Sequence, residues 1–291
     1  MDFEVLRFDG RALRGPDEEI VTWPDLAVLG DPVAHSLSPA LHTAALAERG
    51  IDARYRAVHV RADDLEAALA DAAEAGVRGL NLTLPHKASA IDLCNYVSDE
   101  VHEIGATNTL VRHDTDWRAH NTDARGLALA LQSWRGRRLS RSLGRVVVLG
   151  AGGAARAAVV CARALGARRI EVHARTPDRA RWAEEFGAVV RPLDSTGPLD
   201  ASLVLQCTPL GLDPDHDPSP VAVDALAHDA IAVDTTYADR PSAFLRDAAA
   251  RRVESIDGRG MLVGQAALAF SMWFGAQPPL ETMARAIGLS S

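Results

Sequence analysis

The sequence predicts an α/β protein of two domains, each an open and mainly parallel sheet with helices on both faces. Three observations predict this fold class. The chain has 291 residues, which exceeds the size at which one hydrophobic core usually stops growing. Short apolar segments alternate with segments of helical periodicity, which is typical of parallel sheets covered by helices. A polar segment at 135–144 interrupts this alternation and suggests a linkage between domains, because a new apolar strand follows it directly.

The elements of the first domain are predicted in order along residues 1–132. Residues 3–8 and the turn at Asp9-Gly10 indicate a short strand, so the first 24 residues would form an extra ribbon. The next strands are predicted at 26–30, 55–60 and 79–84. The helices between and after them are predicted at 38–50, 63–75 and 88–103. The last elements are predicted as a strand pair at 106–112 and 117–121 and a helix at 127–132.

A second series of strands and helices follows the polar segment. Its strands are predicted at 145–150, 168–174, 202–207, 230–234 and 253–256. Its helices are predicted at 153–165, 177–186 and 241–251, and two more, at 261–274 and 279–288, would return to the first domain. We therefore expect one domain from residues 1–125 together with 259–291, and another from residues 126–258.

Composition and charge exclude several classes of protein. Hydrophobic residues make up 47% of the chain and charged residues 24%, which is ordinary for a globular protein. The net charge of −8 weighs against nucleic-acid binding, which needs clustered Lys and Arg. No run of about 18 apolar residues predicts a membrane span, and acidic residues among the first 24 argue against a signal peptide. We expect a small molecule as the partner, with no nucleic acid and no membrane.

The cysteine and histidine positions also bear on class and location. Cys94, Cys161 and Cys207 are widely spaced and form no CxxC pair, which favours a reducing, cytoplasmic location. None of the ten histidines has the spacing of a metal-binding motif. The sequence therefore predicts no metal site.

A glycine-rich turn lies between the predicted strand 145–150 and the helix after it. Gly150 would permit a tight turn, Gly152 would let the backbone approach a pyrophosphate, and the N–H groups that open the helix would meet its charge. The alternative is a plain strand-to-helix turn, but the strand–helix–strand context favours a Rossmann-type dinucleotide site. The next strand leads into Arg175 and Arg179 instead of the acidic residue of an NAD site. These cations favour the 2′-phosphate of NADP, the alternative being solvated surface arginines.

Two other segments carry more polar side chains than packing requires. Ser36 and Ser38 follow the strand at 26–30, at the edge where open sheets bind ligands, and their hydroxyls suit a carboxylate. Ser38, before Pro39, is also a favourable helix cap. Lys87 follows the strand at 79–84, where an isolated lysine is more often simply solvated.

Six segments together resemble the ordered motifs of the shikimate dehydrogenase family. They are GDPVAHSLSP at 30–39, NLTLPHK at 81–87, GATNTL at 105–110, NTD at 121–123, GAGGAAR at 150–156 and DGRGMLVGQA at 257–266. The resemblance extends from about residue 26 to residue 275, so only the amino-terminal ribbon lacks a counterpart. It implies a substrate domain built from both ends of the chain around an NADP domain. The implied activity is the NADPH-dependent reduction of 3-dehydroshikimate to shikimate, a step toward chorismate and the aromatic amino acids.

The resemblance also implies roles for individual residues. Lys87 and Asp123 would be the catalytic acid–base pair. The substrate contacts would be Ser36 and Ser38 for the carboxylate, Asn81, Thr83, Asn108 and Gln265 for the ring hydroxyls, and Tyr237 nearby. The cofactor contacts would be Gly150, Gly152, Gly153, Ala154, Arg175, Thr176, Arg179, Thr208 and Gly258. Hydride delivery to a ketone develops negative charge on its oxygen, which the Lys87 ammonium would neutralise by donating a proton, with Asp123 holding that ammonium charged.

Some positions depart from the family pattern. Gln206-Cys207-Thr208 stands where the family often has Asn-Ala-Thr, Ala124-Arg125 follows Asp123 where glycine is common, and Thr235-Thr236 is unusually polar. We expect Gln206 to extend a polar contact to the cofactor and Cys207 to be a buried packing residue.

The sequence is also compatible with alternatives to this activity and with more than one assembly state. A quinate or aminoshikimate dehydrogenase of the same superfamily, accepting NAD, is the nearest alternative. The alternative of another class is a non-catalytic nucleotide-binding sensor, which loss of Lys87 or Asp123 would have signalled. Both a monomer and a homodimer are compatible with the sequence.

Overall fold

The computed structural model describes residues 4–138, 143–193 and 199–289 and divides into two compact units. One unit comprises residues 1–122 and 263–291, and the other comprises residues 123–262. The polar segment at 135–144, where the sequence suggested a linkage, falls inside the second unit, and its residues 139–142 lie outside the described ranges. No helix within the described ranges is long and apolar enough to cross a membrane.

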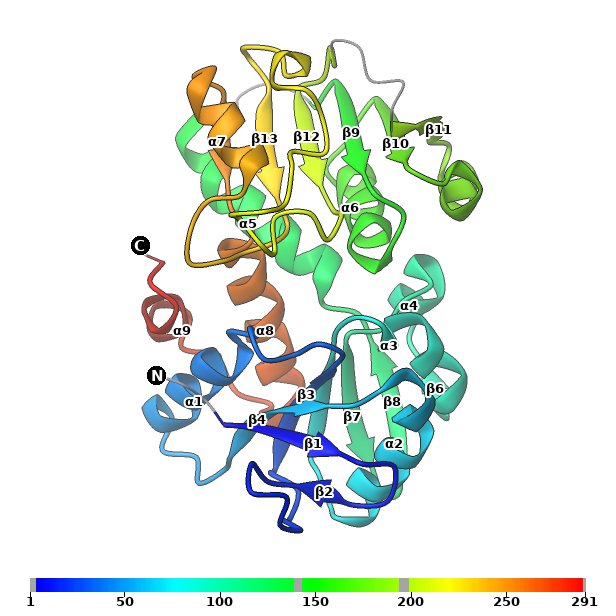
Figure 1. The fold of residues 1–291 in the computed structure, drawn as a ribbon, viewed down its shortest axis with the longest axis vertical. Helices are drawn as coiled ribbons and strands as arrows, with labels where there is room; N and C mark the ends of the chain where they lie inside the picture. Colours follow the sequence, from blue (N-terminus) through cyan, green and yellow to red (C-terminus); the bar gives the residue numbers. More distant parts are fainter. Residues whose placement is uncertain (1–3, 139–142, 194–198, 290–291) are drawn as a thin grey trace. The chain divides into compact units, whose positions relative to one another are not determined.

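The first unit is built on an eight-stranded mixed sheet (Figure 1). Its strands are β1 (Val5–Phe8), β2 (Leu13–Arg14), β3 (Leu26–Gly30), β4 (Tyr55–His59), β5 (Gly79–Leu82), β6 (Tyr96–Val97), β7 (Thr109–His113) and β8 (Asp116–His120). They lie in the order β2-β1-β4-β3-β5-β7-β8-β6. Strands β1, β4, β3 and β5 run parallel, so their carboxyl ends meet at one edge. The predicted amino-terminal ribbon is present, since β1 and β2 pair antiparallel and extend the sheet beyond β4.

Helices pack on the sheet of the first unit and bury its central strands on both faces. These helices are α1 (Ser38–Glu48), η1 (Ala62–Asp64), α2 (Leu65–Glu74), α3 (His86–Ser89), η2 (Ala90–Leu93), α4 (Asp99–Ile104), the greater part of α8 (Arg259–Phe274) and α9 (Leu280–Ala286). Ala27 and Leu29 of β3 belong to the core that α2 covers, whereas Leu26 and Val28 alternate to the opposite face. This continuous apolar pattern is the reason β3 could be predicted from sequence.

The single helix predicted at 88–103 is wrong. The segment forms η2, then the short strand β6, then α4. Strand β6 pairs with β8, and the backbone N–H groups of Asn95 and Ser98 donate to the carbonyls of Trp117 and Ala119. Pairing with a strand some twenty residues later thus overrides the local helical periodicity.

The second unit is a six-stranded parallel sheet. Its strands are β9 (Arg145–Leu149), β10 (Arg169–Ala174), β11 (Val189–Pro192), β12 (Leu203–Gln206), β13 (Ile231–Asp234) and β14 (Glu254–Ile256), in the order β11-β10-β9-β12-β13-β14. The connecting helices are α5 (Asp123–Arg138), α6 (Gly153–Ala164), η3 (Pro177–Phe186), η5 (Val223–Ala225) and α7 (Ala243–Ala250). The order reverses between β9 and β12, and ligands of such sheets bind at the carboxyl ends there.

Two features of the second unit differ from the predictions. The segment 177–186 is helical as expected, but it is a 3₁₀ helix. Strand β11 was not predicted, because only Val189 and Val190 mark it as apolar and it lies exposed at the sheet edge.

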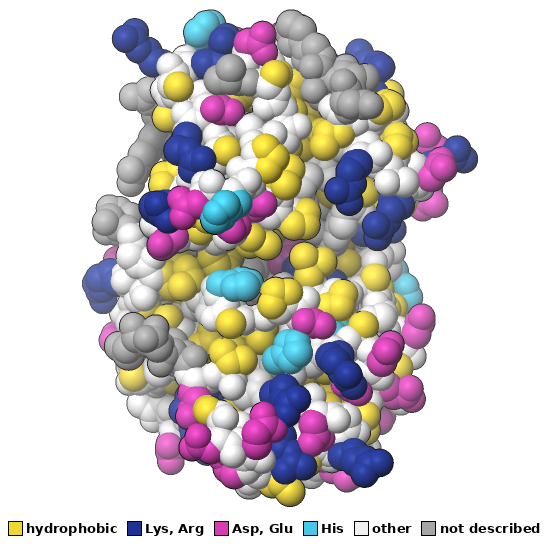
Figure 2. Space-filling view, in the orientation of Figure 1, with side chains coloured by type: hydrophobic (Ala, Val, Ile, Leu, Met, Phe, Trp, Pro, Cys, Tyr) yellow, Lys and Arg dark blue, Asp and Glu magenta, His cyan; other side chains and the backbone are white. Residues whose placement is uncertain are grey.

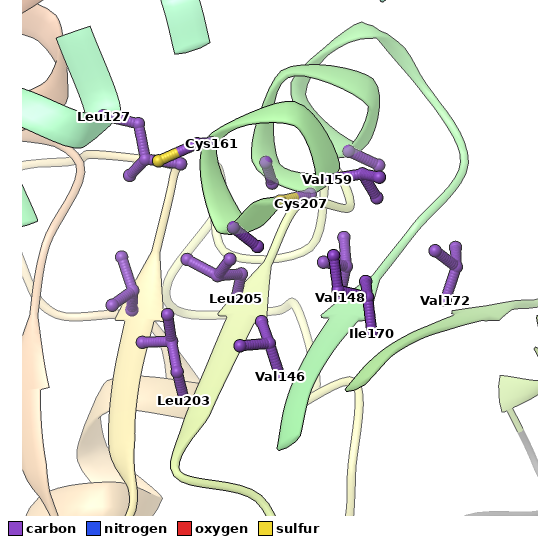
Figure 3. Packing of buried hydrophobic residues seen from close by; sticks show 14 of the residues in the cluster. Leu127, Val146, Val148, Val159, Cys161, Ile170, Val172, Leu203, Leu205 and Cys207 are labelled. Carbon is purple, nitrogen blue, oxygen red and sulfur yellow. The ribbon is translucent and has the colours of Figure 1, made fainter. Parts of the chain in front are cut away.

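Alternating residues of the central strands form the core beneath α6 (Figure 3). Val146 and Val148 of β9 point toward this helix together with Leu205 of β12. Cys161 and Cys207 belong to the same core, and burial raises the pKa of each thiol to about 12. Both side chains therefore remain protonated thiols and act in packing, which is the role predicted for Cys207.

On the opposite face of the same sheet, a buried carboxylate gathers several cations. Glu171 is fully buried on β10, and its oxygens lie 2.6 Å from Arg145, 2.7 Å from Arg169, 3.1 Å from Arg191 and 3.2 Å from His173. Burial alone raises the pKa of Glu171, but hydrogen bonds from Arg145 and His173 and the charges of the arginines outweigh it and lower the pKa to about 2.

Replacing Glu171 with Gln should destabilise the protein in a pH-dependent way. The folded pKa lies below the ordinary value of 4.5, so the stabilisation is complete above pH 4.5 and is lost as pH falls toward about 2. We expect Glu171→Gln to lower the free energy of unfolding at pH 7 by on the order of 3 kcal/mol. This difference, measured by urea unfolding, should shrink steadily below pH 4.5.

The exposed pair of Asp178 and Arg181, 2.9 Å apart, supplies a matched control. Because both partners are solvated, Asp178→Asn should leave the unfolding midpoint nearly unchanged. Equal effects of the two substitutions, or a Glu171→Gln effect that is constant between pH 7 and 3, would contradict the assignment.

Candidate active site

The predicted carboxylate-binding serines lie at the carboxyl end of β3. The helix α1 begins at Ser38 itself, its N-cap residue is Leu37, and no side chain caps it. The prediction that Ser38 caps the helix is therefore wrong, since a residue inside the first turn cannot accept from the N–H groups two or three residues on. Ser36 Oγ instead accepts from the N–H of Ser38 at 3.3 Å. Within the described ranges, the hydroxyl of Ser38 has no hydrogen-bond partner, which leaves it available to a ligand.

Three of the four residues predicted to bind ring hydroxyls form one buried amide cluster in the first unit. Asn81 Nδ2 donates to the carbonyl of Asn108 at 3.1 Å, and Asn108 Nδ2 lies 3.3 Å from Gln265 Oε1. Each of the three side chains is at most 7% exposed. Thr122 joins them, because its N–H donates to Asn108 Oδ1 at 2.8 Å. The cluster thus unites β5, the residues before β7, the chain before α5, and α8.

The orientation of the Asn81 amide is fixed by its neighbours. Tyr55 donates its hydroxyl hydrogen to Asn81 Oδ1 at 2.8 Å. Asn81 Nδ2 uses both hydrogens inside the protein, on the Asn108 carbonyl and on Thr109 Oγ1 at 3.2 Å. With both amide hydrogens engaged, Asn81 has no hydrogen left to donate to a ligand.

Thr83, the fourth of these residues, is half-buried beyond the end of β5. Its methyl group packs on Gly30, where an added Cβ would lie only 2.3 Å from Thr83 Cγ2. Gly30 is therefore required for the close approach of the segments that carry the serines and Thr83.

Lys87 is held by contacts on both sides of its own backbone. It is the second residue of α3, half-buried, and its carbonyl accepts from the N–H of Thr107 at 2.7 Å. The preceding His86 is buried, with Nε2 hydrogen-bonded to the Val60 carbonyl at 2.8 Å, and burial lowers its pKa. The buried imidazole of His86 thus anchors the turn that carries Lys87.

Lys87 is also the only lysine among the 291 residues, whereas 30 positions are arginine. Arginine cannot release its proton in proteins, but lysine can do so when its surroundings change. The single lysine of the sequence is thus found at the predicted catalytic position. The single lysine therefore points to this position independently of the motif spacing.

Asp123 opens α5 and is 4% exposed, so the second predicted catalytic residue is a buried carboxylate. The chain immediately before it is tied down, since Asn121 Nδ2 donates to the Ala106 carbonyl at 2.8 Å and Thr122 belongs to the amide cluster. Lys87 belongs to the first unit and Asp123 to the second, and their pairing stays a prediction.

In the second unit, the glycine-rich turn has the geometry of an anion cradle. Gly150 has a φ of +123°, and a Cβ there would lie 2.8 Å from the Cys207 carbonyl oxygen, so only glycine fits. Gly152 is different, because a Cβ at this position would meet nothing within 4 Å. The protein itself does not need glycine there, which is consistent with space kept for a ligand. The helix α6 begins at Gly153 without a side-chain cap, so its first N–H groups can meet a phosphate.

Two unpaired cations follow β10 beside this turn. Arg175 and Arg179 are exposed, and within the described ranges neither side chain makes a hydrogen bond or ion pair. Thr176, between them, is the N-cap residue of η3. The only acidic residue of β10 is Glu171, whose carboxylate is already paired with Arg145, Arg169 and Arg191. The residues present therefore fit the 2′-phosphate of NADP better than the free ribose hydroxyls of NAD.

The prediction that Gln206 reaches the cofactor is wrong, because its side chain is fully buried and bonded to its own chain. Thr235 and Thr236 likewise bond internally, through their hydroxyls, to the Gln206 carbonyl at 2.9 Å and to Asp234 Oδ1 at 2.7 Å. The unusual polarity at these positions thus serves to shape the loops after β12 and β13.

Asp234, at the end of β13, is a residue that the sequence did not single out. It is fully buried, and its carboxylate accepts from Thr236 and Ser242. Burial raises its pKa, although these hydrogen bonds act in the opposite direction. Tyr237 follows it and lines a pocket of about 140 Å³ together with Asp257 and Arg259. Gly258 packs on this loop, since a Cβ there would lie 2.5 Å from the Thr235 carbonyl oxygen.

Charged side chains of both signs are interspersed on the face shown in Figure 2. Within the described ranges, no group of three or more His, Cys, Asp and Glu side chains is arranged to hold a metal ion.

Two models of known protein families match parts of this chain. Residues 28–110 match the model of the shikimate dehydrogenase substrate binding domain, and residues 258–287 match that of the shikimate 5′-dehydrogenase C-terminal domain. The NADP(+) shikimate dehydrogenase of Methanopyrus kandleri is 37% identical over 276 residues, which cover 90% of this chain and 94% of that relative.

Solved structures are similar over the same length. The shikimate 5-dehydrogenase of Thermus thermophilus, solved in complex with NADP(H) and shikimate, is 38% identical with a TM-score of 0.81, covering 90% of this chain and 97% of that one. The quinate dehydrogenase of Corynebacterium glutamicum, solved in complex with NAD, is 26% identical with a TM-score of 0.79 over 90% and 97% of the two chains. With relatives above 30% identity over nine-tenths of its length, this chain belongs to the shikimate dehydrogenase family.

Proposed function

We propose that this chain catalyses the reversible, NADPH-dependent reduction of 3-dehydroshikimate to shikimate, with Lys87 and Asp123 as the acid–base pair. The observation that carries the proposal is the buried cluster of Asn81, Asn108 and Gln265, in a chain similar over nearly its full length to NADP-dependent shikimate dehydrogenases. Hydrogen bonds within the protein fix the orientation of these buried amides, and a fixed set of polar groups suits the recognition of ring hydroxyls.

The substrate side of the proposal assigns donors and acceptors separately. Ser36 and Ser38 supply hydroxyl hydrogens to the carboxylate of the substrate. Asn81 accepts from a ring hydroxyl, because its two amide hydrogens are already used within the protein. A substrate that lacks this hydroxyl loses a hydrogen bond to a buried group, which is a basis for discrimination.

On the reacting oxygen, the chain supplies a proton. Bound NADPH contributes the hydride, and the Lys87 ammonium donates its proton to the oxygen on which negative charge develops. Asp123, a buried carboxylate, favours the charged form of the lysine. In the oxidative direction, neutral Lys87 accepts the proton from the substrate hydroxyl. Oxidation of shikimate should therefore become faster as pH rises.

The alternatives find less support. The quinate dehydrogenase is the more distant relative, and its cofactor, NAD, does not need the two free arginines of this chain. A sensor without catalysis would have no use for a lone lysine in a chain that otherwise employs arginine. For assembly, we propose a monomer or a homodimer, and a cytoplasmic location fits the three free cysteines.

One assay tests the proposed function. Formation of NADPH is followed with shikimate and with quinate, and each is repeated with NAD+ in place of NADP+. We expect shikimate with NADP+ to give the highest kcat/KM. A preference for quinate and NAD+ would overturn the proposal.

Substitutions of Lys87 test the acid–base assignment. Lys87→Ala should lower kcat by about 10²-fold or more, because proton transfer in the transition state is lost, while the Kd for NADP+ stays nearly constant. Lys87→Arg retains the charge but cannot exchange a proton, and we expect nearly the same loss of turnover.

Lys87→Arg with turnover near the wild-type value would show that charge alone suffices, and Lys87→Ala with normal turnover would remove the residue from the mechanism. A chemical test is also available, since an amine-acylating reagent has only Lys87 and the chain's amino terminus to modify. Shikimate should protect Lys87 against acylation, as measured by peptide mass spectrometry.

Substitutions of Arg175 and Arg179 test the cofactor assignment. Each change to Ala should raise the KM for NADPH by about 10–100-fold, since a charge-assisted hydrogen bond contributes roughly 1.5–3 kcal/mol. The kcat at saturating NADPH and the KM for NADH should change little. Arg181→Ala is the matched control, because Arg181 lies on the same helix but is already paired with Asp178. A similar loss in all three variants would indicate a general charge effect instead of phosphate recognition.

A further inference from the structure

The amide of Gln206 is surrounded by the backbone of the four residues that follow it. Its Oε1 accepts from the N–H of Thr208 at 2.5 Å, and its Nε2 donates to the Thr208 carbonyl at 3.2 Å and to the Leu210 carbonyl. The side chain is fully buried, and its donors and acceptor are all engaged. Gln206 thus ties down Thr208–Leu210, whose one other side-chain bond within the described ranges runs from the N–H of Leu210 to Thr208 Oγ1 at 3.2 Å.

The far end of this segment is held independently. Gly211 has a φ of +106°, and a Cβ there would lie 2.8 Å from Ser242 Cβ and 3.3 Å from Asp234 Oδ2. Its N–H donates to Asp217 Oδ2 at 2.8 Å. The segment after β12 is therefore fixed at one end by Gln206 and at the other by the close packing of Gly211.

The backbone held by Gln206 is in contact with the glycine-rich turn. A Cβ on Gly150 would lie 2.8 Å from the Cys207 carbonyl oxygen and 3.3 Å from the Thr208 nitrogen. The same Thr208 N–H donates to the Gln206 amide. Any shift of the Cys207–Thr208 peptide is thus transmitted to the first glycine of the turn, and the carboxyl ends of β9 and β12 move together.

We propose that Gln206 is a positioning residue for the dinucleotide, because its buried amide holds the Cys207–Thr208 peptide against which the Gly150 turn packs. Gln206 itself touches no ligand and is not a catalytic residue. It acts on two predicted cofactor contacts, Gly150 and Thr208, and on none of the predicted substrate contacts of the first unit. The inference rests on the proposed function, since it assumes that the turn binds NADP.

Gln206→Leu tests the proposal with a side chain of similar size that lacks the amide. Three backbone groups then lose their partner, and the segment can move to reach water. We expect the Kd for NADP+, measured by calorimetric titration of the free enzyme, to rise about 10-fold, which equals about 1.4 kcal/mol. The Kd for shikimate, measured without cofactor, should stay within twofold of the wild-type value. A role in general stability would not separate the two ligands in this way.

Gln206→Glu provides a second variant with its own signature and covers the case in which Gln206→Leu does not fold. A protonated carboxyl can still accept from the Thr208 N–H and donate once to a carbonyl, whereas an ionised one faces two carbonyls without a hydrogen to offer. The ratio of the NADP+ Kd of this variant to that of the wild type should therefore rise with pH between about pH 5.5 and 9.

Ser202→Ala is the matched control at the amino end of β12. Ser202 Oγ accepts from the N–H of Gly144 at 3.1 Å and donates to the Arg145 carbonyl at 3.0 Å, so it also ties a side chain to backbone. This change should lower the Tm and leave the NADP+ Kd unchanged.

The inference is overturned if a folded Gln206 variant binds NADP+ within twofold of the wild type at every pH, or if Ser202→Ala weakens NADP+ equally. A wild-type chain that binds no NADP+ at all would refute the proposed function as well, so the two failures are distinguishable.

Discussion

The N–H of Cys207 donates to the Leu149 carbonyl at 2.8 Å, and this bond extends the parallel pairing of β12 with β9 to the end of both strands. The pairing brings the Gly150 turn and the Thr208 segment, almost sixty residues apart in the chain, to one edge of the sheet. The first unit uses the same constraint, because β3, β4 and β5 are parallel and deliver Ser36, Ser38 and Thr83 to a single edge. Both candidate ligand sites depend on parallel strands that end together.

Buried polar groups fix the geometry of these sheet edges. The amide cluster around Asn108, the carboxylate of Asp234 and the amide of Gln206 are all nearly inaccessible to water, and each is satisfied by hydrogen bonds within its own unit. Such groups are costly when unpaired, so their geometry is sharply determined. Within the described ranges, the hydroxyl of Ser38 and the guanidinium groups of Arg175 and Arg179 make no hydrogen bond or ion pair, and these are positions predicted to meet anionic parts of substrate and cofactor.

Most of the fold could be predicted because periodicity reports burial. The strand at 26–30 and the helix opened by Pro39 follow from local apolar pattern and proline placement alone. The prediction of one helix at 88–103 was wrong, because β6 exists only through its pairing with β8. Strand β11 could not be predicted either, because an exposed edge strand has little apolar periodicity. The roles of the candidate site residues stay predictions, whereas the predicted cap role of Ser38 and the predicted cofactor contact of Gln206 are wrong.

The sequence by itself determined which kinds of side chain stand at the candidate sites. It has a lone lysine among thirty arginines and glycines where a strand turns into a helix. It has no acidic residue where an NAD site would need one. These are properties of single positions and short segments, so they can be judged without a partner. Only the tertiary structure decided which polar groups form hydrogen bonds within the protein and which can still bind a ligand. Asn81 donates both amide hydrogens within the protein, to the Asn108 carbonyl and to Thr109 Oγ1. The amide of Gln206 likewise bonds to the backbone that follows it in the chain. Such allocation depends on distances between segments remote in sequence, which no local pattern encodes.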